Sequence, residues 1–136
     1  MKTIIITGGN SGLGFETAKK VAGNPEYKVI LACRNAEKAQ KAKEQIVSET
    51  GNAHIEAMRL DTSSLDSARA FAEKFIASGE KADVLVNNAG ISPVGNTGTT
   101  ENGFELVFAT NYLGHFLLTQ LLLPYMTEDA AIFNAT

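Results

Sequence analysis

Apolar and polar residues alternate along the chain in blocks of two kinds. Short blocks rich in β-branched residues are typical of buried strands, and longer blocks with an apolar residue every three or four positions are typical of helices. The expected strands are "KTIIIT" (2–7), "YKVILACR" (27–34), "AHIEAMRL" (53–60), "ADVLVNN" (82–88) and "AAIFNA" (130–135). The expected helices lie between them, at 12–23, 35–50, 64–79 and about 100–126.

This alternation predicts right-handed βαβ crossovers, and hence a doubly wound α/β fold with a parallel sheet and helices on both of its faces. Residues at the expected helix ends agree with it. Asn35 is placed to cap the second helix, and Ser63 or Ser64 to cap the third. Glycines stand at positions 23, 51 and 79, where the first three helices should stop.

The helix expected at 100–126 is apolar almost all round, so it needs cover on more than the side that faces the sheet. Its most apolar stretch, "YLGHFLLTQLLLPYM", is interrupted by His115, Gln120 and Pro124. It therefore falls short of the roughly 18 uninterrupted apolar residues that indicate a membrane span. We interpret this segment as a buried helix and expect no membrane span.

Composition narrows the class of protein. The 136 residues suit a single domain (1–136), and 44% hydrophobic with 20% charged residues is typical of a globular protein. The net charge of -3, without a basic stripe, argues against nucleic acid as a partner. Cys33 is the single cysteine, which excludes a disulfide framework or a thiolate cluster, and no residues are spaced for a metal. The apolar stretch after Lys2 is too short for a signal peptide, so we expect a cytoplasmic protein.

The segment "TGGNSGLG" (7–14) joins the first expected strand directly to the first expected helix. Such a turn presents free N–H groups and the positive end of the helix dipole, and glycines let an anion approach closely. The spacing of Gly8, Gly12 and Gly14 differs from the standard G-x-G-x-x-G fingerprint, and the loop lacks the Gly-Lys-Ser/Thr ending of a nucleoside triphosphatase. The loop therefore predicts a diphosphate cradle and disfavours kinase or ATPase chemistry.

Two motifs together resemble one family. "TGGNSGLG" is similar to the Thr-Gly-x-x-x-Gly-x-Gly loop of the short-chain dehydrogenases/reductases, and "NNAG" (87–90) is similar to the family's element after its fourth strand. With "ACRN" and "TNYLGHF", they look most like the branch of protochlorophyllide reductases and retinol dehydrogenases. The resemblance covers the whole chain. It implies a Rossmann-like sheet of strand order 3-2-1-4-5, ending after the fifth strand and so incomplete on its C-terminal side.

The resemblance also implies a nicotinamide dinucleotide as cofactor. The loop residues expected to contact it are Gly8, Asn10, Ser11, Gly12, Leu13 and Gly14. About 20 positions further on, at the tip of the second strand, an acid suits a free ribose 2'-hydroxyl and an arginine suits a 2'-phosphate. Arg34 holds this position and no acid lies between Val29 and Asn35, so the sequence favours NADP(H) over NAD(H). The alternative is that Arg34 is a solvated residue at the end of a strand.

Further cofactor contacts are implied position by position. Asp61 matches the family's acid that hydrogen-bonds the adenine amino group, with Thr62 beside it. A capping role for Asp61 at the helix that begins near Ser63 is the alternative, and the two roles are compatible. The cofactor's ribose side is expected to be lined by Asn88, Ala89 and Gly90. Asn87 is interpreted as structural, tying adjacent strands together.

The family's catalytic tetrad is Asn, Ser, Tyr and Lys, with the tyrosine as proton donor and the asparagine supporting a water-linked relay. Asn111 in "TNYLGHF" matches the asparagine, and a satisfied core amide is the alternative. The family's serine pair after the fifth strand aligns with Thr136 as its first member. None of Tyr27, Tyr112 and Tyr125 has a lysine four positions later. His115, on the same helical face as Asn111, is expected to play a supporting role.

The leading hypothesis is the NADP(H)-binding part of an oxidoreductase that transfers hydride between nicotinamide and a small carbonyl or alcohol substrate. One alternative is a non-catalytic NADP(H)-binding module that senses the cofactor or binds a partner through the 100–126 helix. Another is a different nucleotide-using Rossmann protein, such as a methyltransferase. Some apolar residues of that helix are expected to face water, among Phe108, Phe116, Leu118 and Leu122. They predict self-association, a partner or a longer native chain, and we favour the last.

Overall fold

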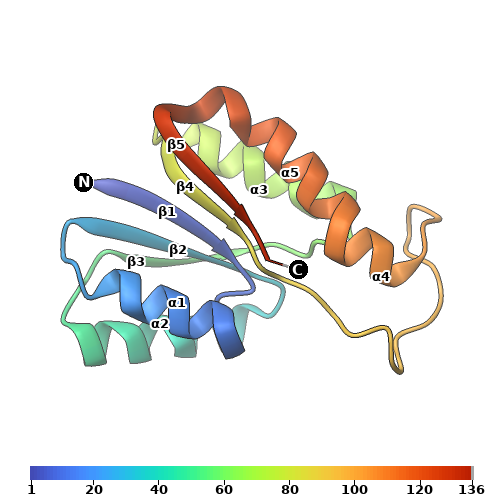
Figure 1. The fold of residues 1–136 in the computed structure, drawn as a ribbon, viewed down its shortest axis with the longest axis horizontal. Helices are drawn as coiled ribbons and strands as arrows, with labels where there is room; N and C mark the ends of the chain where they lie inside the picture. Colours follow the sequence, from blue (N-terminus) through green and yellow to red (C-terminus); the bar gives the residue numbers. More distant parts are fainter. Residues whose placement is uncertain (136) are drawn as a thin grey trace.

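The computed structural model describes residues 1–135. One parallel sheet has the strand order β3-β2-β1-β4-β5, as the sequence analysis expected. Its strands are β1 (Lys2–Thr7), β2 (Tyr27–Cys33), β3 (Ile55–Arg59), β4 (Ala82–Asn87) and β5 (Met126–Asn134). One face carries α1 (Gly12–Ala22) and α2 (Ala36–Thr50), and the other carries α3 (Leu65–Ala77), α4 (Leu106–Phe108) and α5 (Gly114–Leu122), as Figure 1 shows. The doubly wound α/β fold is confirmed.

The expected helix caps are present. The Asn35 side chain accepts a hydrogen bond from the N–H of Lys38 at 2.9 Å, which fixes the start of α2. Ser64, rather than Ser63, caps α3. Gly51 ends α2 with φ of +75°, a left-handed conformation that suits glycine. Each such side-chain cap contributes about 1 kcal/mol, so the sequence itself sets these boundaries.

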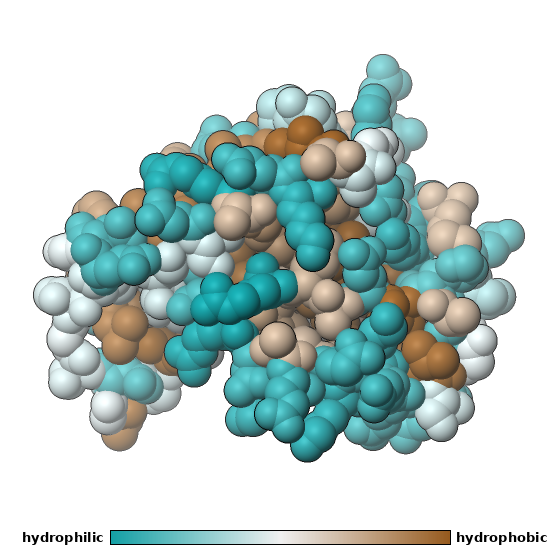
Figure 2. All heavy atoms as spheres, turned by 180° about the vertical axis from the view of Figure 1, so that it is seen from behind, coloured by the Kyte–Doolittle hydropathy of each residue, from teal (hydrophilic) through white to brown (hydrophobic). Residues whose placement is uncertain are grey.

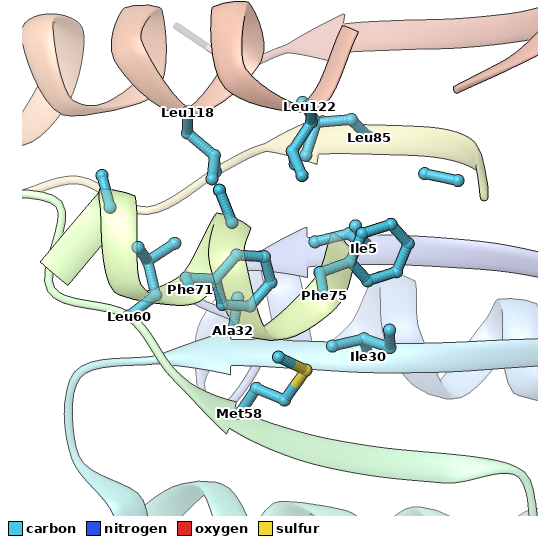
Figure 3. Close-up of a cluster of buried hydrophobic side chains, with 13 residues drawn as sticks. Ile5, Ile30, Ala32, Met58, Leu60, Phe71, Phe75, Leu85, Leu118 and Leu122 are labelled. Atoms are coloured by element: carbon cyan, nitrogen blue, oxygen red, sulfur yellow. The ribbon is translucent and has the colours of Figure 1, made fainter. Parts of the chain in front are cut away.

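The larger core lies between the sheet and helices α3 and α5. Phe71 and Phe75 of α3 pack in one buried cluster with Leu118 and Leu122 of α5 and Leu85 of β4 (Figure 3). Each of these five side chains is at most 2% exposed. The expectation that Leu118 or Leu122 would face water is therefore wrong, because α3 and the sheet already cover that side of α5.

The helix expected at 100–126 begins later than predicted, at Leu106. Residues 99–105 form a turn closed by a bridge between Thr99 and Glu105, with Gly103 at φ of +83°. The Glu105 carboxylate then accepts hydrogen bonds from the N–H groups of Val107 and Phe108 and caps the helix. This leaves Phe104, expected inside the helix, in the preceding turn.

The helical run is not a regular α-helix. After α4 comes a π-helical turn, η1 (Ala109–Leu113), in which the N–H of Gly114 bonds the carbonyl of Ala109 five residues back. The run then continues through α5 into a 3₁₀ turn, η2 (Leu123–Tyr125), and β5 starts at Met126 rather than at Ala130. π-turns inside helices are often found at functional sites, and this one contains Asn111.

The outer side of this run is apolar and exposed. Phe108, Tyr112 and Phe116 stack in a row with ring centroids 5.4 and 6.5 Å apart, and 48, 60 and 53% of their surfaces are exposed. By length and composition alone, Leu106–Tyr125 would be able to cross a membrane. Core helices of folded domains pass the same test, and α5 packs against α3 here. The expectation of exposed aromatic residues is thus confirmed for Phe108 and Phe116.

Strand β5 forms one edge of the sheet, as expected, and its Phe133 is 59% exposed. An apolar groove of about 510 Å³ runs beside it, between α1 and the sheet. The face turned away from the viewer in Figure 1 is different, because hydrophilic residues dominate it and hydrophobic ones show only in small separate groups (Figure 2). Most of the large exposed apolar side chains lie between Phe108 and Phe133, on the last helical run and β5, with Leu13 and Val94 exposed elsewhere.

Candidate cofactor site

A cleft of about 490 Å³ lies at the carboxyl ends of the parallel strands. Segments far apart in the sequence form it, namely the glycine loop after β1, the end of β2 with the start of α2, the segment after β3 and the segment after β4. It is lined by Gly8, Asn10, Ser11, Leu13, Ala32, Arg34, Asn35, Lys38, Leu60, Asp61, Thr62, Asn88, Ala89, Gly90, Ile91 and Thr110. Ligands of open α/β sheets bind at this edge of the sheet.

Most of the expected cofactor residues line this one cleft. Of the expected cofactor residues, Gly12 and Gly14 do not, and the expected catalytic residue Asn111 does not line it either. Six further lining residues were not expected from the sequence, namely Ala32, Asn35, Lys38, Leu60, Ile91 and Thr110. Of these, only Lys38 gave a usable sequence signal, because it is a basic residue in the first turn of the helix that follows Arg34.

The glycine loop is tight because its backbone lies against the end of β4. Gly8 has φ of +67°, and its N–H donates to the carbonyl of Ala32 at 2.8 Å. A Cβ at Gly8 would come within 2.9 Å of the Cα of Ala89. Gly12, with φ of +57°, begins α1 and has open space where a Cβ would lie. Glycine is thus needed at position 8 because a Cβ would clash with Ala89, and at both positions because φ is positive.

Gly14 supports the loop from beneath and is buried. A Cβ there would overlap the carbonyl oxygen of Gly8 and the side-chain nitrogen of Asn88. The same Asn88 nitrogen donates to the carbonyl of Thr7 at 3.2 Å. The third glycine of the motif therefore lets α1, the glycine loop and the end of β4 pack together, without facing the cleft itself.

Two cations stand at the end of the cleft beyond β2. Arg34 and Lys38 are both exposed and both line it. Within residues 1–135, no carboxylate forms an ion pair with either. Their charges are therefore available to an anionic group in the cleft.

Asp61 lines the cleft and also orders the turn before α3, although Ser64 and not Asp61 caps that helix. One carboxylate oxygen accepts hydrogen bonds from the N–H of Ser63 at 3.0 Å and from its hydroxyl at 2.7 Å. Thr62 beside it is 5% exposed and also lines the cleft. The turn holds the Asp61 carboxylate at the cleft wall, where it is able to accept a hydrogen bond from a ligand amino group.

Asn111 stands beside the cleft, and its side chain is held by the backbone of Ile91. Its Oδ1 accepts from the N–H of Ile91 at 2.8 Å, and its Nδ2 donates to the carbonyl of Ile91 at 3.0 Å. A Cβ at Gly90 would approach Asn111 Oδ1 to 3.2 Å. Asn111 is exposed, so it is not a core amide. Its side chain ties the π-turn to the segment after β4.

Asn87 is structural, as expected. Its Nδ2 donates to Asn134 Oδ1 at 2.9 Å and to Thr119 Oγ1 at 3.1 Å, which links β4 to β5 and to α5. Thr136, aligned by the resemblance with the first serine of the family's pair, lies outside the described residues. Within the described part of the chain, no three His, Cys, Asp or Glu side chains gather in a way that would hold a metal ion.

Burial lowers the pKa of His115, and the carbonyl of Asn111 opposes this shift only in part. The ring is 6% exposed. The unfolded chain takes up a proton near the ordinary pKa of 6.5, whereas the folded chain does so only at lower pH. The contribution of His115 to the free energy of unfolding is therefore complete above pH 6.5 and is lost as the pH falls through its folded pKa.

We predict that the free energy of unfolding falls more steeply for the parent chain than for His115→Gln as the pH is lowered from about 7 to about 5. Urea unfolding at a series of pH values measures both slopes. The carboxylates titrate in both proteins, so the difference between the curves isolates His115. Parallel curves would show that His115 carries no lowered pKa.

Comparison with known proteins gives one consistent result. A family model described as short chain dehydrogenase matches residues 2–134. Human "Retinol dehydrogenase 13" is 48% identical over 132 residues, which covers 95% of this chain and 38% of that protein. "Short-chain dehydrogenase TIC 32 B, chloroplastic" from Brassica napus is 44% identical over 128 residues, covering 94% of this chain and 39% of that protein.

A solved structure has the same arrangement of elements. The crystal structure of a metagenomic short-chain oxidoreductase in complex with NADP superposes with a TM-score of 0.77 at 28% identity. The match covers 91% of this chain and 56% of that one. The present chain thus spans about two fifths of the length of the two curated relatives, at 38% and 39%.

Proposed function

The chain belongs to the short-chain dehydrogenase family, and from this premise we propose that it forms the NADP(H)-binding part of an oxidoreductase acting on a carbonyl or alcohol. One observation carries the proposal, namely that the segments after β1, β2, β3 and β4 all line a single cleft. The nicotinamide, when bound, supplies or accepts the hydride. The residues of this chain bind and orient the cofactor.

The glycine loop fits the diphosphate. Gly8 and Gly12 carry no side chain and have positive φ, so the backbone of the loop is open at these two positions. Helix α1 begins at Gly12, so the positive end of its dipole faces this loop. Ser11 makes no side-chain capping bond, which leaves its hydroxyl able to donate to a phosphate oxygen. Asn10 and Leu13 complete this wall.

Arg34 and Lys38 favour NADP(H) over NAD(H). A ribose 2'-phosphate at the end of β2 would meet both cations, and a guanidinium binds phosphate through two parallel hydrogen bonds. NAD(H) would leave these charges without a partner. The sequence offers no acid from 29 to 35 to accept a hydrogen bond from a free 2'-hydroxyl.

The remaining walls suit the adenine and the second ribose. The Asp61 carboxylate accepts from the adenine amino group, and Thr62 lies beside it. Asn88, Ala89 and Gly90 hold the ribose side, with two small residues that let the sugar come close to the sheet. Asn111 supports the proton relay from a fixed position, because the backbone of Ile91 holds its side chain.

The catalytic proposal is tested on the protein purified from its natural source, incubated with NADPH and a panel of small aldehydes and ketones. We expect loss of NADPH absorbance that depends on the carbonyl compound. A matched control is Gly12→Val, which forces a branched side chain onto backbone with φ of +57° and should abolish cofactor binding and turnover together. Tight NADPH binding without turnover by the natural protein would favour a non-catalytic module instead. The names of the two curated relatives, both of which contain the word dehydrogenase, support the catalytic proposal over the non-catalytic one.

The exposed aromatic row of Phe108, Tyr112 and Phe116 is proposed as a self-association surface, because the stacked rings expose a continuous apolar strip. Phe116→Glu should shift the chain toward the monomer in sedimentation velocity experiments. Gln40→Glu makes the same charge change at an exposed position of α2, on the other face of the sheet, and serves as the control. A parent chain that remains monomeric at high concentration would contradict this surface.

A further inference from the structure

His115 joins three segments of chain that surround the cofactor cleft. It lies in the first turn of α5 and is 6% exposed. Its Nε2 is 2.8 Å from the hydroxyl oxygen of Thr7, the last residue of β1. Its Nδ1 is 3.3 Å from the carbonyl oxygen of Asn111 in the π-turn. The ring therefore bridges the start of the glycine loop and the turn that carries Asn111.

The hydrogen bonds of Thr7 decide which ring nitrogen carries the proton. A hydroxyl has one hydrogen to donate and two lone pairs that accept. The Thr7 oxygen already accepts from the N–H of Asn88 and the N–H of Ala89, each at 2.9 Å. Both lone pairs are then occupied, so the hydroxyl hydrogen points to His115. Nε2 must accept it, and the ring proton must lie on Nδ1, facing the carbonyl of Asn111.

We propose that His115, in its neutral Nδ1–H tautomer, is a positioning residue for the cofactor cleft. It orients the Thr7 hydroxyl so that Thr7 binds both N–H groups at the end of β4. The inference rests on the proposed function, because it assigns a role in holding NADP(H). Burial lowers the pKa of His115, which keeps the ring neutral at pH 7.

The hydrogen bonds that start at His115 end at the cleft wall. Thr7 directly precedes Gly8, and Asn88 and Ala89 line the cleft themselves. The Asn88 side chain adds bonds to the carbonyls of Thr7 at 3.2 Å and Gly8 at 3.5 Å. Without an acceptor at position 115, the buried Thr7 hydroxyl would lose its partner. It would turn to find another and release the N–H of Asn88 or of Ala89.

The tautomer is read directly from the ring nitrogens by ¹⁵N NMR of the 136-residue chain. The chain has two histidines, and the exposed His54 serves as an internal reference for the ring-nitrogen signals in the same spectrum. We expect the His115 ring proton on Nδ1 and a bare Nε2. A protonated Nε2 would overturn the inference, because the Thr7 hydroxyl would then face a donor. This measurement needs no cofactor and no variant.

The positioning role is tested by NADPH dissociation constants. His115→Leu fills similar space without an acceptor and should weaken binding about tenfold, equivalent to about 1.4 kcal/mol. His115→Gln offers an amide oxygen close to the place of Nε2 and should stay within about threefold of the parent. Thr7→Val should weaken binding as much as His115→Leu, and combining the two should add little.

A purely structural histidine would give a different pattern. His115→Leu would then lower the melting temperature and leave the NADPH affinity of the folded protein unchanged, which would overturn the positioning role. If His115→Leu does not fold, Thr7→Val against Thr7→Ser tests the same hydroxyl, and equal NADPH affinities there would overturn the inference. Failure of the parent chain to bind NADPH would instead overturn the proposed function and the positioning role with it, and the NMR measurement would still decide the tautomer.

Discussion

Replacing Gly114 with alanine should lower the free energy of unfolding by about 3 kcal/mol or more. Gly114 is buried at the start of α5, where the helix presses on the backbone after β3. A Cβ there would overlap the carbonyl group and Cα of Thr62. Backbone atoms are unable to rotate away as a side chain does, so α5 or the cleft wall would have to move. Urea denaturation of both proteins measures the difference.

Gly23→Ala is the matched control for this substitution. Gly23 ends α1 with φ of -59°, which any residue adopts, and the nearest atom to an added Cβ is the carbonyl oxygen of Lys20 at 3.2 Å. We expect its effect to stay within about 1 kcal/mol in either direction. If Gly114→Ala were equally mild, the close contact between α5 and Thr62 would be contradicted.

Arg34→Glu should weaken NADPH binding by about 100-fold while leaving NADH binding within about threefold. The change removes a charge-assisted contact to the 2'-phosphate and places a carboxylate against it, and a carboxylate suits the free 2'-hydroxyl of NADH. Calorimetric titration with each cofactor gives the two dissociation constants. The ratio of the two is the diagnostic quantity, because general damage to the fold would weaken both.

Lys41→Glu provides the control for net charge. Lys41 is an exposed residue of α2 that does not line the cleft, and its substitution changes the charge by the same amount as Arg34→Glu. We expect it to leave the ratio of NADPH to NADH affinity nearly unchanged. Equal losses for both substitutions would mean that long-range charge, rather than contact with Arg34, selects the cofactor.

The sequence predicted the fold well wherever local signals and the hydrophobic pattern agree. The runs that became β1 and β2 are short, β-branched and bounded by turn residues, and Asn35 and Ser64 are typical capping residues that mark helix starts. The glycine motif predicted the cradle because its chemistry is local to eight consecutive residues. The resemblance supplied Asp61 and the segment 88–90, which the structure brings to the same cleft.

The predicted start of the last helical run was wrong because the residue that caps this run is atypical. Glu105 is not a preferred capping residue, and the turn before it depends on Gly103 and on the pairing of Thr99 with Glu105. The π-turn has no sequence pattern of its own. Because the helix is apolar on all sides, the sequence did not indicate which side α3 would cover. Buried Leu118 was therefore predicted to face water together with Phe116, which is exposed.

Contacts between residues far apart in the sequence could not be predicted from the sequence. Thr7 and His115 are 108 positions apart and meet only because β1 ends and α5 begins at the same edge of the sheet. The spacing of Asn111 and His115 gave a shared helical face but no partner for the ring. Lys38 joins Arg34 at the cleft because α2 starts directly above the end of β2. Such groupings follow from the packing of elements, which a local pattern does not specify.

The central claim is that one cleft formed by four separate segments holds NADP(H). The most direct measurement is the map of backbone amide shifts in ¹H–¹⁵N spectra of the chain as NADPH is added. We predict saturable shifts that cluster at Gly8–Gly14, Arg34, Asp61–Thr62 and Asn88–Ile91 and spare the outer side of α5. Shifts confined to the exposed aromatic row or to the groove beside β5, or no saturable shifts at all, would contradict the account.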